Sequence, residues 1–132
     1  MKNWWLIPLI VAVGIALAAP SWYIVRRGHA KRIREANYQS MLQSYSAILK
    51  PGVSRKDVEQ SIRTRGINFE RRCCITQSEY DDFVRIGNEP APWYCSEHNV
   101  FLAFRFQQAW PEPSDSDVLK TISVEHKLDN CL

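Results

Sequence analysis

The chain has 132 residues and a formal net charge of +3 at pH 7, which leaves room for one small domain. The excess positive charge lies entirely before Glu35, because that part of the chain contains no acidic residue. The remainder is mildly acidic and lacks a Lys/Arg stripe. Because neutralising several phosphates supplies most of the affinity for nucleic acid, we expect no nucleic-acid partner.

An apolar segment near the start of the chain runs from Trp4 to Val25 without a charged residue. As a helix rising about 1.5 Å per residue it would span the hydrocarbon core of a bilayer. Aromatic residues mark both of its ends, and Arg26-Arg27 follows as a charged stop. We therefore predict an N-terminal flank at 1–3, a transmembrane signal-anchor helix at 4–25, a basic juxtamembrane segment at 26–34 and a small domain at 35–132.

Two signals bear on where this domain lies. The Lys/Arg excess after the predicted helix favours the cytoplasm, whereas an even set of four cysteines is typical of domains outside the reducing cytosol. We expect a single-pass protein of the bacterial inner membrane with its domain on the periplasmic side. A cleaved signal peptide is the alternative, since Ala16-Leu17-Ala18 resembles a cleavage site.

The domain opens with two predicted helices. The first is indicated by apolar residues at three- and four-residue steps, namely Ile33, Met41, Leu42, Tyr45, Ile48 and Leu49. The breaker Lys50-Pro51-Gly52 ends it. Ser54 as N-cap, with Asp57 three residues later, predicts a second helix from Arg55 to Arg65, and Gly66 suits its C-cap.

Three strands follow in the prediction. Apolar and polar residues alternate over Ile67 to Ile75, Val100 to Gln107 and Val118 to Leu128. Between the first two lies a predicted long connection, Thr76 to Asn99, with an acidic patch at Glu79, Asp81 and Asp82. The pattern predicts an α+β fold in which two helices pack on a three-stranded antiparallel sheet.

The turn and the start of the second helix carry a resemblance. The residues are Leu49, Pro51, Gly52, Val53, Ser54, Val58 and Glu59. Together with the element order they resemble the SmpA/OmlA group, also called BamE-like, of small envelope domains. The resemblance implies two helices on a three-stranded sheet and an envelope setting. Members of that group typically carry an acylated cysteine after the signal, whereas this chain has none before Cys73, so lipidation does not carry over.

The cysteines are the first candidate site. Adjacent cysteines rarely bond to each other, so we expect Cys73 and Cys74 to reach separate partners, Cys95 and Cys131, although three full pairings exist. A metal site using these cysteines and His98 is an alternative, but the spacing lacks two chelating pairs. No metal, cofactor or catalytic residue is predicted.

The stretch from Glu89 to His98 is the second candidate. Two prolines and the pair Trp93-Tyr94 would make a stiff, exposed interaction loop together with His98, although the two aromatic residues could equally fill the edge of the core. His126 falls on the apolar side of the last strand, where a partly buried histidine is expected.

These features predict a membrane-tethered, non-enzymatic interaction or structural module of the bacterial envelope. It would act on an envelope protein through the Trp93-Tyr94 loop or a free sheet edge, and a small-molecule substrate is not expected. The alternative is a thiol- or metal-dependent membrane enzyme that uses Cys95 and His98.

Overall fold

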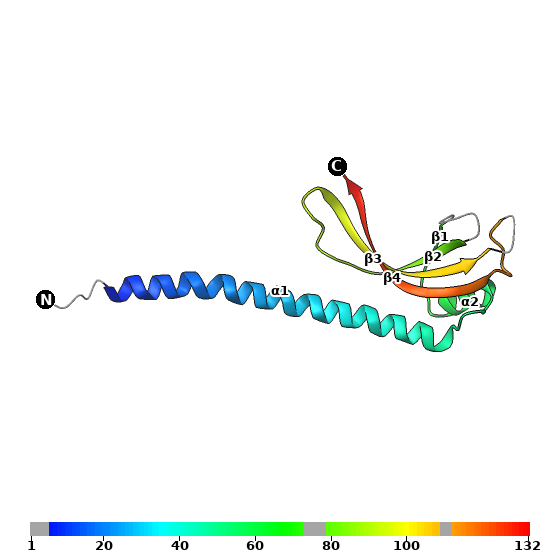
Figure 1. The fold of residues 1–132 in the computed structure, drawn as a ribbon, viewed down its shortest axis with the longest axis horizontal. Helices are drawn as coiled ribbons and strands as arrows, with labels where there is room; N and C mark the ends of the chain where they lie inside the picture. Colours follow the sequence, from blue (N-terminus) through cyan, green and yellow to red (C-terminus); the bar gives the residue numbers. More distant parts are fainter. Residues whose placement is uncertain (1–5, 73–78, 109–111) are drawn as a thin grey trace. The chain divides into compact units, whose positions relative to one another are not determined.

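The computed structural model of the chain describes residues 6–72, 79–108 and 112–132, with side chains from residue 22 onward (Figure 1). Contacts divide the chain into two compact units, residues 1–37 and residues 38–132. Each unit is described by itself. The second contains the sheet, the core and the candidate site.

Helix α1 (Leu6–Ile48) runs without interruption through the predicted anchor, the basic segment and the first amphipathic helix. Among the residues that the structure describes, no helix is long and apolar enough to cross a membrane. The predicted transmembrane helix at 4–25 is therefore wrong. The predicted juxtamembrane segment continues the same helix and exposes charged side chains such as Arg26, Arg27, Lys31 and Arg32.

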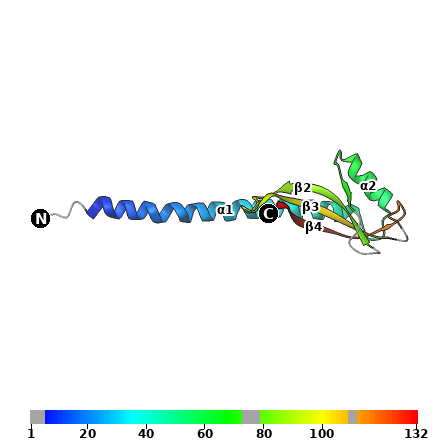
Figure 2. The same cartoon turned by 90° about the horizontal axis from the view of Figure 1, so that it is seen from above.

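In the second unit, the end of α1 and helix α2 (Arg55–Thr64) pack on one face of an antiparallel sheet (Figures 1 and 2). The described residues form four strands in the order β1-β2-β3-β4. The strands are β1 (Glu70–Arg72), β2 (Glu79–Asn88), β3 (Cys95–Gln107) and β4 (Val118–Cys131). Each strand pairs with its neighbour in the sequence, so β1 and β4 form the two edges.

The predicted three-stranded sheet is wrong because β2 lies inside the segment that the sequence marked as a connection. Strand β3 also begins earlier than predicted, at Cys95. The acidic residues of β2 concealed it, since carboxylates are unusual in a central strand. Two of them are buried in ion pairs: Asp82 contacts Arg55, and Asp81 contacts Arg105 across the sheet.

The predicted second helix is confirmed, and its first turn explains its position. The Ser54 hydroxyl accepts a hydrogen bond from the backbone N-H of Asp57 at 3.3 Å. The backbone N-H of Arg55 donates to the carbonyl of Asp117 at 2.8 Å. These bonds satisfy N-H groups that a helix cannot satisfy internally. Gly66 follows the C-cap with φ of 70°, a left-handed conformation that favours glycine.

The core lies between the two helices and one face of the sheet. It joins residues from α1, α2 and three strands: Tyr45, Leu49, Val58, Ile62, Tyr80, Val84, Leu102, Phe104, Phe106 and Leu119. On the other face, Phe83, Phe101 and Ala103 form a smaller cluster. The Lys127 ammonium lies 4.5 Å from the centre of the Phe83 ring, so a long cationic side chain shields apolar surface there.

A buried ion network joins α2 to the sheet. Both nitrogens that Arg55 directs at Asp82 lie within hydrogen-bond range of its carboxylate, at 2.8 and 3.1 Å. Arg55 also contacts Glu59 one turn later at 3.0 Å, and Arg71 of β1 binds Glu59 at 2.7 and 2.9 Å. Burial acts to lower the pKa of Arg55, but the hydrogen bonds and charge of Asp82 outweigh it and raise that pKa. The guanidinium therefore stays charged inside the fold.

We expect Arg55→Met to lower the free energy of unfolding by about 3–5 kcal/mol, because it leaves the Asp82 carboxylate buried without its cation. Urea denaturation followed by circular dichroism measures the change. Adding Asp82→Asn removes the unpaired negative charge and should restore part of the lost free energy of unfolding.

Arg63→Met is the matched control. Arg63 lies on the same helix, but its side chain is 67% exposed and its contact with Glu59 is longer, at 3.6 Å. It should cost less than about 1 kcal/mol. Equal losses for the two arginines would contradict the assigned role of Arg55.

Candidate functional site

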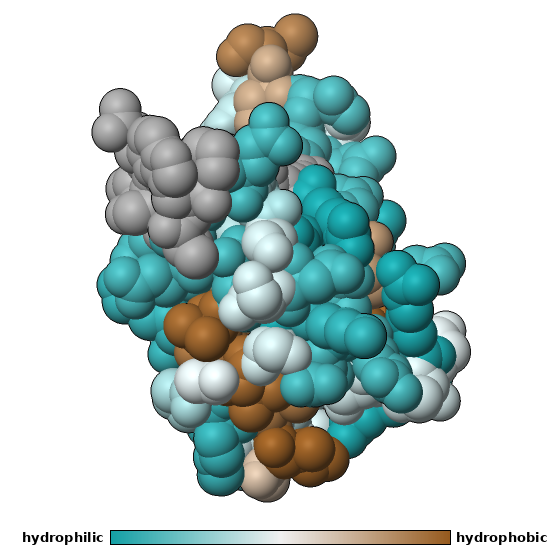
Figure 3. Space-filling view, turned by 90° about the vertical axis from the view of Figure 1, so that its right-hand side faces the viewer, coloured by the Kyte–Doolittle hydropathy of each residue, from teal (hydrophilic) through white to brown (hydrophobic). Residues whose placement is uncertain are grey.

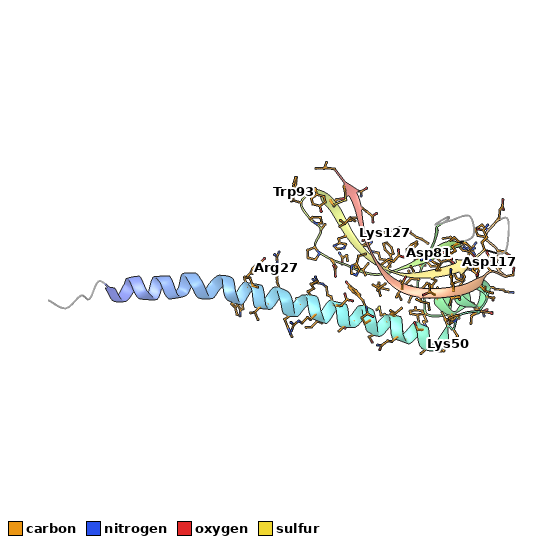
Figure 4. All side chains as sticks on the ribbon, in the orientation of Figure 1. Arg27, Lys50, Asp81, Trp93, Asp117 and Lys127 are labelled. Atoms are coloured by element: carbon orange, nitrogen blue, oxygen red, sulfur yellow. A yellow bond between two sulfur atoms is a disulfide. The ribbon has the colours of Figure 1, made fainter. Side chains whose placement is uncertain are left out.

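The candidate site lies at the end of the sheet where β2 passes through residues 89–94 into β3 and where β4 ends (Figure 4). A disulfide between Cys95 and Cys131 closes this end. The two residues are directly opposite each other in the antiparallel register of β3 and β4, with Cα atoms 4.0 Å apart. The backbone N-H of Leu132 donates to the carbonyl of Tyr94 at 2.8 Å, which continues the pairing past the disulfide.

The observed pair differs from the pairing that the sequence favoured, in which Cys95 and Cys131 each bond to one of the adjacent cysteines. The antiparallel register of β3 and β4 places Cys95 directly opposite Cys131. Cys73 and Cys74 lie outside the described residues. Because the Cys95 sulfur is bonded, it supplies neither a thiolate nucleophile nor a metal ligand.

Among the described residues of the second unit, the most exposed aromatic side chain lies on the loop before Cys95. Trp93 is 90% exposed and Tyr94 is 43% exposed, and their rings meet edge to face with centroids 5.8 Å apart. Figure 4 places Trp93 at the tip of the sheet end. The backbone N-H of Cys95 donates to the Pro92 carbonyl at 3.0 Å, so a tight turn holds the pair. The alternative in which Trp93 fills the core edge is wrong.

Below this loop, Glu89, His98 and His126 converge from three separate segments. The Glu89 carboxylate oxygen Oε2 lies 3.8 Å from Nδ1 of His98 and 3.6 Å from Nδ1 of His126. The two imidazole rings have centroids 5.7 Å apart. One potential ligand atom from each of the three side chains lies within 4.8 Å of the others, so these residues could hold a metal ion.

Backbone pairing positions the two histidines and the carboxylate. His98 pairs with Leu128 and His126 pairs with Val100, so the histidines are diagonal neighbours on one face of β3 and β4. The backbone N-H of Glu89 donates to the His98 carbonyl at 2.8 Å, which fixes the third side chain beside them.

Tyr38, in the part of α1 that belongs to the second unit, contacts the cluster. Its ring meets His126 edge to face, with centroids 6.3 Å apart, and it lies against Gly87. A Cβ atom at Gly87 would stand 2.8 Å from the Tyr38 hydroxyl oxygen. A side chain at position 87 would therefore displace the Tyr38 ring, at a point where the pairing of β2 with β3 is irregular.

The sequence pattern indicated His98 and Trp93 as candidate residues but did not indicate that Glu89 and His126 lie beside His98. The shared apolar parity of His126 with Ile122 and Val124 was visible in the sequence. No signal in the sequence gave the register of β3 against β4, which decides that His126 meets His98.

A hollow beside α2 has a volume of about 450 Å³ and a largely charged lining of Lys56, Glu59, Gln60, Arg63, Thr64, Arg71 and Asp115. Figure 3 views this end of the domain, which is mainly hydrophilic. Arg71 is already held by two hydrogen bonds to Glu59. Because Glu59 already pairs with both Arg71 and Arg63, the hollow is a weaker candidate than the disulfide-closed end.

Comparison of the chain with protein-family models, with curated proteins and with solved structures gives no match. The geometry of the site is therefore the basis for assigning a function.

We expect Cys95→Ala/Cys131→Ala to lower the free energy of unfolding by about 3–4 kcal/mol, because a disulfide that closes a loop of this length restricts the unfolded chain. The sequence separation of the two cysteines is 36 residues. Urea denaturation of both forms measures the difference. Ser96→Ala, an exposed neighbour on β3, is the control and should be neutral. A double variant as stable as the parent would contradict a stabilising role for this disulfide.

Proposed function

We propose that the chain is a non-enzymatic protein-binding module of the bacterial envelope and that the loop carrying Trp93 and Tyr94 is its contact surface. The observation that carries the proposal is the 90% exposure of Trp93 on a turn whose last residue, Cys95, is disulfide-bonded to Cys131. Exposing an indole to water gives up the free energy that its burial would contribute, about 25 cal/mol for each Å² of apolar surface. A partner that covers the ring would recover it.

The rigidity of the loop supports binding rather than an irregular surface feature. Backbone hydrogen bonds at Cys95 and Leu132, together with the disulfide, fix the residues on either side of the aromatic pair. A preformed aromatic anchor loses little conformational entropy on association, which is why Trp and Tyr dominate the energetics of protein interfaces.

The disulfide also supports an exported location for the domain, because such bonds persist outside the reducing cytosol. Two helices on one face of an antiparallel sheet support the proposed resemblance to BamE-like envelope domains, although this sheet has one strand more than that group implies. The thiol version of the enzyme alternative loses its nucleophile, since Cys95 is bonded to Cys131.

If the domain is exported, Cys95 and Cys131 should be oxidised in growing cells. In a Cys73→Ser/Cys74→Ser background, acid-quenched cells treated with a maleimide of high mass should show a shifted band only after reduction. A shift without reductant would place these thiols in a reducing compartment and contradict the exported location.

If Trp93 is the contact, a photo-crosslinking amino acid at position 93 should give one discrete product in intact cells, identifiable by mass spectrometry. The same probe at exposed Gln60 on α2 should not give this product. Against the purified partner, Trp93→Ser should weaken binding at least about 30-fold, as expected when a central aromatic anchor is removed.

Trp22→Ser is the matched control, because Trp22 is also an exposed tryptophan but belongs to the first unit. It should leave the affinity within about twofold of the parent. The proposal fails if no product forms at position 93 or if Trp93→Ser binds as tightly as the parent.

A further inference from the structure

We propose that Glu89, His98 and His126 form a binding site for one divalent transition-metal ion of the Zn²⁺ type. Two imidazole nitrogens and one carboxylate oxygen are ligands that such ions favour, and three protein ligands with a remaining position for water are a common arrangement for zinc. The inference is independent of the proposed protein-binding function.

The distances among the three side chains suit an ion better than direct hydrogen bonds. Donor atoms bound to one tetrahedral zinc ion lie about 3.3 Å apart, given bonds of about 2.0–2.1 Å. The Glu89 oxygen lies 3.6 and 3.8 Å from the two histidine nitrogens, and one ligand atom from each side chain lies within 4.8 Å of the others, so side-chain rotations would bring the three atoms to that value. The same distances exceed the range of an N-H···O hydrogen bond, about 2.7–3.2 Å.

The backbone already holds the ligands in place. His98 and His126 stand on adjacent strands that pair over most of their length, and the Glu89 N-H donates to the His98 carbonyl at 2.8 Å. Metal binding therefore requires no rearrangement of the sheet, and little conformational entropy is lost when the ion enters.

Two of the three side chains are largely buried, and the third is more exposed to water, as a metal site with a route of entry requires. Glu89 is 13% exposed and His98 is 21% exposed, so the charge of the carboxylate is poorly screened by water. His126 is 38% exposed and leaves an open approach for an ion. Tyr38 packs against the His126 ring and limits its orientation.

The ligand chemistry also predicts selectivity. Imidazole suits zinc, cobalt, nickel and copper, whereas Mg²⁺ and Ca²⁺ prefer sites made entirely of oxygen. When bound, the ion would fasten residue 89 to both β3 and β4. That attachment lies immediately before the loop that carries Trp93.

The test uses the disulfide-bonded 132-residue chain without a polyhistidine tag. Calorimetric titration with Zn²⁺ should show one ion per chain, and Co²⁺ should give the visible d-d absorption of a tetrahedral site. Mg²⁺ and Ca²⁺ at equal concentrations should give no signal. Proton–nitrogen NMR of the imidazoles should show Zn²⁺-dependent shifts at His98 and His126 but not at His29, the remaining histidine of the chain.

Variants assign the ligands. Glu89→Gln, His98→Ala and His126→Ala should each weaken Zn²⁺ binding at least about 30-fold, since losing a ligand costs as much as or more than losing its supporting contacts. His29→Ala and Glu97→Gln are matched controls and should stay within about twofold.

Absence of stoichiometric Zn²⁺ binding would overturn the proposal. So would NMR shifts centred on His29, or affinity that survives both His98→Ala and His126→Ala. The NMR arm uses the parent chain, so the proposal remains testable even if a variant does not fold.

Discussion

The fold of the second unit depends on one buried cation. The Arg55 guanidinium at the start of α2 binds the Asp82 carboxylate in the middle of β2, and both side chains are excluded from water. A positive charge in the first turn of a helix opposes the helix dipole, so this arginine is unfavourable there unless the sheet supplies an anion. The guanidinium carbon of Arg55 also lies 4.6 Å from the centre of the Tyr80 ring, which adds a cation–π contact. The ion pair thereby fixes how α2 sits on the sheet.

The same interaction explains what the sequence could predict and what it could not. Helix α2 follows from local signals, since Ser54 and Gly66 act within a few residues of the turns that they cap. Strands β3 and β4 follow from alternation of apolar residues. Strand β2 does not, because a carboxylate in a central strand is acceptable only when a distant arginine neutralises it, and Arg55 is 27 residues away in the sequence.

The candidate site, too, could be predicted from the sequence only in part. The proline-bounded aromatic pair marked Trp93 as a candidate but left open whether it is exposed, and a disulfide could be inferred from the cysteine count. The identity of the pair, Cys95 with Cys131, depends on strand register, as does the meeting of His98 with His126. The long apolar run of the N-terminal segment suggested an anchor, yet pattern length alone did not reveal that α1 continues through the charged residues that follow.

The disulfide at the end of β4 also limits how copies of the chain can associate. A strand at a sheet edge can be exchanged between copies or paired with another edge, and both routes can lead to aggregation. The Cys95–Cys131 bond ties that strand to its own β3, while residues 52–54 pair with the start of β4 from the outer side. Near its end, Asn130 adopts a left-handed φ of 52°, which interrupts the extended edge. These features oppose exchange of β4 between copies of a domain that also exposes Trp93.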